Sequence, residues 1–386
     1  MHINSLKKIE RELRAISIFR SDFDFNSRNK SMLHDGISYS LPNESVKKFN
    51  EIIEKILKQD DFQSKFSSNY IENKIKYIFS EIVKNNEVDV LYLLEQLISE
   101  LSSYSEEWTV YLKIVGIEMD CCSEFGNVKL MPGESYLLDR LKEKAKYIND
   151  KTLGSDEGKK VHFRLLTKEL EDLCNATCVS CVQVIAEPIR ARQLAIEETE
   201  RVIDLMNYLA KSLYPREQIK INTQGVHPVS LRKTIAFTSD HLSTSIDSIG
   251  TPVLLKINHE TIRHIEEING FKISEIIAKK QTTKFEESLI KCLHWFSVAL
   301  HQAEPTNSYL FNIIAIESLF KQVQGSSIGS TVSESTAFIL QSDMNVRLEL
   351  VKTMRKYYSN RSAVAHGGKT VINDSDLMNL FNGMSQ

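Results

Sequence analysis

The sequence lacks the features that define several common protein classes. It contains no G-x-x-x-x-G-K-[ST] loop and no G-x-G-x-x-G turn, so it carries neither of the usual nucleotide-binding motifs. No run approaches the ~20 apolar residues of a membrane span, and residues 1–15 lack the apolar centre of a secretory signal. Six cysteines in 386 residues do not make a disulfide scaffold. These absences predict a cytoplasmic protein with free thiols and no membrane contact.

Charge of one sign is not in excess either. The 48 basic and 51 acidic residues give a formal net charge of -3, so no global basic field attracts nucleic acid and any such contact has to be local. The length suggests two or three domains. We predict an α+β, mainly α chain with a helical region at 1–104, an α+β domain at 105–265 and a helical bundle at 270–386.

Apolar spacing predicts the elements of the first two regions. Positions three and four apart indicate helices at 46–57, 71–83, 88–101 and 136–148, with Pro188 in the first turn of a later helix. Alternating β-branched and aromatic residues predict strands at 108–117 and 177–186, and shorter β-type runs at 220–222, 231–238 and 253–257. Gly126-Asn127 indicates a turn, 34–42 a loop and 154–158 a linker.

Three cysteines close in the sequence raise the possibility of a zinc site. Cys174, Cys178 and Cys181 contain one C-x-x-C pair, and His162 is the nearby histidine. Structural zinc usually takes four ligands, often from two such pairs. The segment also reads as a helix end entering a buried strand, where cysteine acts as a small apolar residue. Packing is therefore the favoured interpretation and zinc the alternative.

The C-terminal region predicts a compact helical bundle. Helices are expected at 285–300, 310–323, 334–340 and 346–364, with a loop at 325–333 and a short last helix at 376–381. Pro305 lies between the first two helices. Gly367-Gly368 is typical of a helix C-cap and predicts the end of the fourth.

The end of the fourth predicted helix carries the residues of chemical interest. The sequence there is Tyr357-Tyr358-Ser359-Asn360-Arg361-Ser362-Ala363-Val364-Ala365-His366-Gly367, with four residues between arginine and histidine. Upstream, 312–320 reads Asn-Ile-Ile-Ala-Ile-Glu-Ser-Leu-Phe and contains Glu317 among apolar neighbours. With the strand pair at 108–132, these stretches resemble HEPN (higher eukaryotes and prokaryotes nucleotide-binding) proteins, in particular the ApeA-like HEPN proteins of bacterial anti-phage defence.

The resemblance implies a metal-independent endoribonuclease that needs no cofactor. Histidine titrates near neutral pH, which suits His366 to general acid–base catalysis. Arginine binds phosphate through a charged fork, which suits Arg361 to stabilising the transition state. Glu317, Asn360 and Ser362 are expected to support them. Attack by the 2′-hydroxyl requires RNA and would leave a 2′,3′-cyclic phosphate and a 5′-hydroxyl.

The spacing of the pair adds a constraint. Positions five apart in an unbroken helix point about 140° away from each other. Arg361 and His366 can then converge only if the helix ends before His366, or if two chains share a composite site, and the resemblance implies a homodimer of that kind. It also implies a role as a defence nuclease or toxin with a phage-derived trigger sensed by 105–265. The alternative is a non-catalytic HEPN module that binds nucleotide, RNA or a partner protein.

Overall fold

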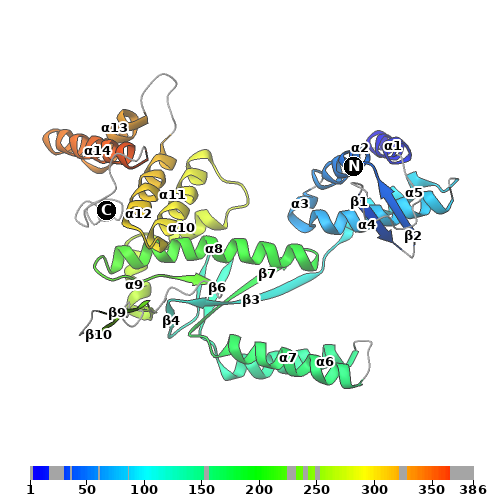
Figure 1. The fold of residues 1–386 in the computed structure, drawn as a ribbon, viewed down its shortest axis with the longest axis horizontal. Helices are drawn as coiled ribbons and strands as arrows, with labels where there is room; N and C mark the ends of the chain where they lie inside the picture. The colour runs from blue at the N-terminus through cyan, green and yellow to red at the C-terminus, as the bar shows by residue number, and fades with distance from the viewer. Residues whose placement is uncertain are drawn as a thin grey trace. The chain divides into compact units, whose positions relative to one another are not determined.

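A computed structural model shows the arrangement of most of the chain. The residues it describes are 3–16, 30–34, 37–59, 61–85, 87–151, 156–223, 232–237, 242–247, 253–320 and 328–365. They are mainly helical with small β-sheets (Figure 1), which confirms the predicted class. Two compact units are present, Met1–Val110 with Gln183–Ala195, and Tyr111–Val182 with Ile196–Gln386. The division into three regions stays a prediction. Among the described helices, none has both the length and the apolar character needed to cross a bilayer.

Helices dominate the first unit. They are α1 (Ile3–Arg14), α2 (Asn43–Leu57), α3 (Phe62–Lys65), α4 (Ser68–Lys84) and α5 (Val90–Ser103). The helices predicted at 46–57, 71–83 and 88–101 are confirmed as α2, α4 and α5. The loop predicted at 34–42 is wrong, because β1 (Lys30–His34) and β2 (Ile37–Leu41) form an antiparallel hairpin in which His34 faces Ile37. Asp-Gly between the strands is a hairpin sequence that the loop prediction overlooked.

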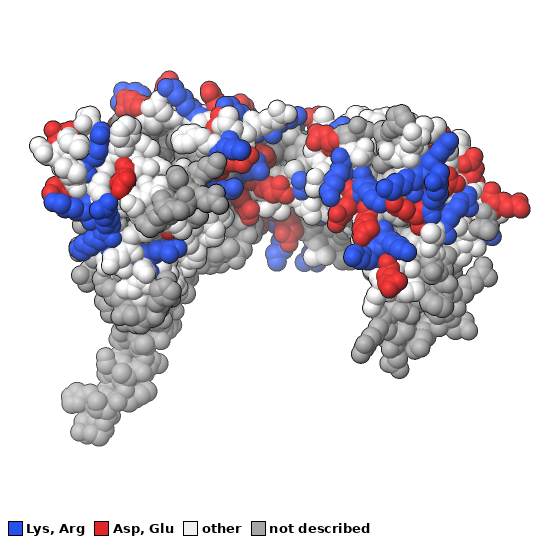
Figure 2. All heavy atoms as spheres, turned by 90° about the horizontal axis from the view of Figure 1, so that it is seen from above, with Lys and Arg blue, Asp and Glu red and all other residues white. Residues whose placement is uncertain are grey.

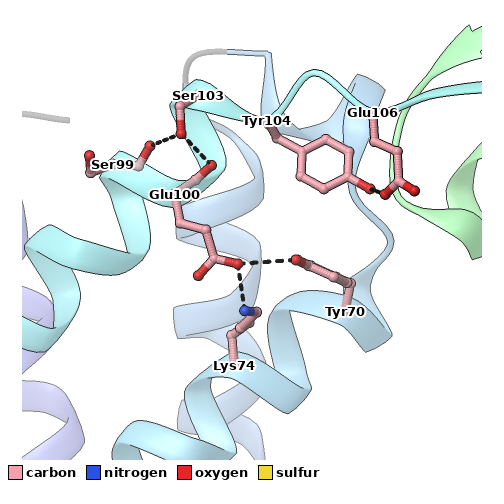
Figure 3. A network of polar contacts seen from close by, with 7 residues as sticks. All are labelled: Tyr70, Lys74, Ser99, Glu100, Ser103, Tyr104 and Glu106. Atoms are coloured by element: carbon pink, nitrogen blue, oxygen red, sulfur yellow. Dashed lines mark hydrogen bonds and ion pairs between the residues drawn. The ribbon is translucent and has the colours of Figure 1, made fainter. Parts of the chain in front are cut away.

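A single apolar core joins α1, α2, α4 and α5. Phe49, Phe66 and Phe79 are among its fully buried members. At its edge, Tyr70 and Lys74 of α4 both bind the Glu100 carboxylate of α5, at 3.3 and 2.5 Å (Figure 3). Burial lowers the pKa of Lys74, but the hydrogen bonds and charges of Glu100 and Tyr70 together outweigh it and the net shift of the pKa is upward. These contacts align α4 with α5 at the surface, where each ion pair contributes little energy.

The largest sheet among the described residues has five strands in the order β5-β6-β7-β3-β8. Its strands are β3 (Glu107–Val115), β5 (Ser123–Phe125), β6 (Val128–Met131), β7 (Cys178–Ile185) and β8 (Asn222–Thr223). β5 and β6 pair in antiparallel register around Gly126-Asn127, as predicted. β6 also pairs antiparallel with β7, which confirms the strand predicted at 177–186.

The strand predicted at 108–117 is interrupted at Gly116. This residue has φ of 96°, and a Cβ atom there would lie 2.2 Å from the backbone oxygen of Lys220. Glycine alone tolerates both conditions. β3 therefore ends at Val115, and β4 (Ile117–Met119) pairs in parallel with β11 (Leu255–Ile257) in a separate sheet. The run at 231–238 is confirmed as β9 (Arg232–Phe237), which pairs with an unpredicted strand, β10 (Leu242–Asp247).

Helices make up the rest of the middle of the chain. They are α6 (Ser135–Lys151), α7 (Asp156–Cys174), α8 (Pro188–Leu213), α9 (His259–Glu267) and α10 (Gly270–Ala278). α6 and α8 confirm predictions, including Pro188 in the first turn. The linker predicted at 154–158 is wrong from Asp156 onward, because α7 begins there. Neither α9 nor α10 was expected, since each is only 9 residues long, shorter than the stretch of about 11–18 residues over which apolar spacing identifies a helix.

Four helices follow in the part of the C-terminal region that the structure describes. They are α11 (Lys284–His301), α12 (Pro305–Leu319), α13 (Ile328–Leu340) and α14 (Met344–Ala365). α12 packs against α11, α13 and α14. A capping box between Thr283 and Glu286 begins α11. The loop predicted at 325–333 is wrong from Ile328, where α13 starts. The predicted cap at Gly367-Gly368 and the helix at 376–381 lie outside the described residues.

Candidate active site

Arg361 continues an apolar row along α14. Leu350, Met354, Tyr357 and Val364 occupy the other positions of this row, three or four residues apart. Met354 and Tyr357 are only 4% and 7% exposed. The row packs with α12 and α13 in one apolar cluster. Arg361 therefore lies on the side of α14 that faces the bundle, where a charged group needs a partner.

Glu317 of α12 supplies that partner. One carboxylate oxygen, Oε1, lies 3.5 Å from Nη2 of Arg361. The Tyr358 hydroxyl donates a hydrogen bond to the same oxygen at 2.9 Å. The Glu317 side chain is 19% exposed and that of Arg361 is 36% exposed, so the cluster is sheltered and the guanidinium still reaches solvent. Burial and the adjacent carboxylate raise the pKa of Tyr358, which keeps its hydroxyl protonated as a donor.

Contacts between α12, α13 and α14 hold this cluster in place. Tyr309 of α12 is fully buried, and its hydroxyl donates to the backbone oxygen of Tyr357 at 2.9 Å. On α13, a Cβ added to Gly329 would lie 3.0 Å from Cδ1 of Tyr358. Tyr358 thus packs closely against one helix while its hydroxyl binds another. The position of the Glu317 carboxylate follows from the packing of three helices.

The structure brings together some of the predicted site residues. Arg361 and Glu317 meet, whereas Ser362 is exposed; Asn360 is half-buried. His366 lies outside the described residues. α14 is continuous from Arg361 to Ala365, so the divergence expected of an unbroken helix applies over that stretch.

A histidine–aspartate pair between α8 and α11 was not found from the sequence. Nδ1 of His294 lies 3.0 Å from Oδ2 of Asp204, and this hydrogen bond raises the pKa of His294. One helical turn away, burial and the charge of Asp204 raise the pKa of Glu200. The imidazole is 56% exposed. No local signal identifies the pair, because its members are 90 residues apart.

The cysteines form no metal site in the described part of the chain. Within those residues, no three histidine, cysteine or acidic side chains are grouped closely enough to hold a metal ion. All six cysteines are free. Cys178 is fully buried in β7, and burial raises the pKa of its thiol to about 12. His162 instead contacts the Asn149 side chain at 3.2 Å. These contacts fit packing as the role of Cys178.

No protein-family model, curated protein or solved structure matches this chain. The contacts among Arg361, Glu317 and Tyr358 therefore carry the functional argument, together with the sequence motif.

Proposed function

We propose that this protein is a metal-independent endoribonuclease of the HEPN type that cleaves RNA by 2′-hydroxyl attack. The observation that carries the proposal is the Arg361–Glu317 contact, with Tyr358 bound to the same carboxylate oxygen. A guanidinium on the bundle side of a helix, held by a fixed carboxylate and open to solvent, suits a bound phosphodiester.

In the proposed reaction, Arg361 neutralises the charge that develops on the phosphorane oxygens. His366 transfers protons to or from the 2′-oxygen and the leaving 5′-oxygen. Glu317 orients the guanidinium, and Tyr358 orients Glu317. Asn360 and Ser362 border Arg361 in the chain and are proposed to contact the RNA backbone.

RNA binding by this chain has to come from local charge. On the face shown in Figure 2, basic and acidic side chains are intermixed, as expected for a net charge of -3. The charge of α14 is less balanced, because this helix carries five basic residues and one acidic residue. This local excess supports an RNA contact along the helix that carries Arg361.

The proposed site is composite and belongs to a homodimer. α14 is unbroken from Arg361 to Ala365, and positions five apart in an unbroken helix diverge, so in this proposal His366 of one copy completes the site around Arg361 of the other. The proposed biological role is that of a defence nuclease or toxin that acts in the cytoplasm on tRNA or phage transcripts. Residues 105–265 would restrain it until a phage-derived trigger binds, because an unregulated ribonuclease harms its own cell.

The experiment is RNA cleavage in EDTA by the full chain and by Arg361→Ala and His366→Ala. We expect cleavage that resists EDTA, products with 2′,3′-cyclic phosphate ends, and a loss of about 100-fold or more in each variant. Mixing the two inactive variants should restore part of the activity, since some mixed dimers then hold one intact site.

Two results would contradict the proposal. Cleavage that persists in either variant would remove that residue from the catalytic site. RNA binding without cleavage, in the presence of candidate triggers, would favour the alternative of a non-catalytic HEPN module.

A further inference from the structure

Two cysteines lie next to each other in the connection between β4 and β5. Cys122 is exposed and Cys121 is half-buried, and both thiols are free. The other four cysteines are Cys174, Cys178, Cys181 and Cys292. Burial raises the pKa of each of these four thiols, so few of them carry the reactive thiolate near neutral pH. Cys122 is therefore the thiol that a reagent in solution reaches most directly, and Cys121 is its neighbour.

Both ends of this connection are held by strand pairing. Residues 120–122 lie between the two strands. On the β4 side, the backbone nitrogen of Asp120 donates a hydrogen bond to the backbone oxygen of Ile257 in β11 at 2.9 Å. On the β5 side, Ser123 pairs with Leu130 of β6. The two thiols thus share a short turn whose ends are fixed, which gives each a high effective concentration toward the other.

A disulfide between adjacent cysteines has an unusual geometry. Consecutive Cα atoms lie about 3.8 Å apart, whereas the Cα atoms of ordinary disulfides are separated by roughly 4.4–6.8 Å. A bond between Cys121 and Cys122 therefore distorts the backbone between them and stores strain. Strained disulfides that are open to solvent are the easily reduced ones. Such a pair suits reversible oxidation rather than permanent stabilisation of the fold.

We propose that Cys121 and Cys122 form a redox site that hydrogen peroxide oxidises reversibly to a disulfide. Cys122 reacts first because it is exposed. Its thiolate sulfur attacks one peroxide oxygen, the O–O bond breaks and hydroxide leaves, which gives a sulfenic acid on Cys122. The thiolate sulfur of Cys121 then attacks the sulfur of Cys122, the S–O bond breaks with loss of a second hydroxide, and the S–S bond forms. The two thiol protons combine with the two hydroxides, so one peroxide is reduced to two waters.

The disulfide changes the structure next to β4. The distorted backbone immediately follows Asp120, whose hydrogen bond to Ile257 holds the end of β4 against β11. Oxidation therefore weakens this hydrogen bond, and reduction restores it. The parallel pairing of β4 with β11 thus responds to the redox state of the two thiols.

The test is a count of free thiols in the full-length protein, unfolded in denaturant after treatment with hydrogen peroxide. Four should remain, the six of the native chain minus the two of the pair. The peptide that contains both cysteines should lose two hydrogen atoms in mass. Cys121→Ser should stop at the sulfenic acid, which dimedone traps on Cys122, and Cys122→Ser should prevent the disulfide. The matched control is Cys181→Ser, another half-buried cysteine, which should leave disulfide formation unchanged.

Two further measurements test reversibility and the structural effect. Reduced glutathione should reopen the disulfide, because the bond is strained. Hydrogen exchange of the Asp120 amide should be faster in the oxidised protein than in the reduced one. Thermal melting of the serine variants checks that they fold. None of these measurements involves RNA or Arg361, so their outcome does not depend on the nuclease proposal.

Several results would overturn the redox site. Six remaining thiols after treatment would show that the pair does not react. A disulfide that joins two chains, or a sulfinic acid on Cys122 of the wild type, would show that Cys121 does not resolve the first product. A disulfide that resists glutathione would contradict the strain, and unchanged exchange at Asp120 would contradict the effect on β4.

Discussion

At the scale of single residues, the candidate site depends on a charged group in an apolar row. The spacing of Leu350, Met354 and Tyr357 matches the position of Arg361 on the packed side of α14, but the sequence does not single that side out, because Val346 and Leu348 of the same helix are exposed. The partner of Arg361 cannot be read from the sequence either, because Glu317 lies on another helix 44 positions earlier in the chain. Tyr358 was not assigned to the site, because an aromatic residue beside an apolar row indicates core packing.

We predict that the Tyr358 hydroxyl stabilises the bundle through Glu317. Tyr358→Phe keeps the ring against Gly329 and removes only the donor to the carboxylate. The free energy of unfolding should fall by about 1.5–3 kcal/mol, the usual size for a hydrogen bond to a charged group. Denaturation with urea measures the change.

Glu317→Gln and the double variant complete a thermodynamic cycle. The losses in unfolding free energy of the two single variants should add up to more than the loss of the double variant, because either change alone removes the charged hydrogen bond. Full additivity would show that the hydroxyl and the carboxylate do not interact.

At the scale of elements, helices were predicted better than strands and connections. α2, α4, α11 and α14 follow from apolar spacing because the period of a helix is a local property. A strand needs a neighbour, and its ends depend on where pairing stops. The end of β3 before Gly116 is an example, because the apolar alternation in the sequence continues past Gly116 although the strand pairing stops there.

We predict that Gly116→Ala strongly destabilises the protein. The new Cβ would meet the Lys220 backbone oxygen, and φ of 96° lies outside the left-handed basin that other residues occupy. The cost should be roughly 2–5 kcal/mol, from strain and overpacking together. Thermal melting measures it.

The matched control is Gly126→Asn. Gly126 has φ of 60°, which asparagine adopts readily. This variant should lose far less stability than Gly116→Ala. Comparable losses at both positions would contradict the explanation given for Gly116.

At the scale of the whole molecule, the first unit is not continuous in the sequence. It combines Met1–Val110 with Gln183–Ala195. Glu187 ties the second stretch to the first. Its carboxylate accepts hydrogen bonds from the backbone nitrogens of Ser67, Ile189 and Arg190 at 2.8–3.1 Å. The backbone nitrogen of Glu187 donates a hydrogen bond to the backbone oxygen of Lys65 at 2.8 Å.

We predict that Glu187 makes stability depend on pH. Burial alone would raise the pKa of Glu187, but the hydrogen bonds that the carboxylate accepts outweigh it and lower the pKa. A depressed pKa means that the ionised form stabilises the fold above the ordinary value of about 4.3 and that this contribution is lost as the pH falls further. Glu187→Ala should cost about 2–3 kcal/mol at pH 7, because three backbone donors lose their acceptor.

Chemical denaturation at pH 7 and pH 3.5 measures both effects. Glu187→Gln is the matched control, since it keeps one acceptor oxygen and removes the charge. At pH 7, Glu187→Gln should lose less stability than Glu187→Ala. Between pH 7 and pH 3.5, it should not show the part of the wild-type loss of stability that comes from protonation of Glu187. A pH profile identical to that of the wild type would contradict the linkage.

The sequence by itself determined the mainly helical class and most of the long helices. Each of these follows from the identity and spacing of residues within one segment. The tertiary structure alone decided which side chains meet: Arg361 with Glu317, Asp204 with His294, and Glu187 with Ser67. These pairs are 44 to 120 residues apart. Nothing local encodes them, because they arise only when separate helices pack and bring their polar groups within hydrogen-bonding distance.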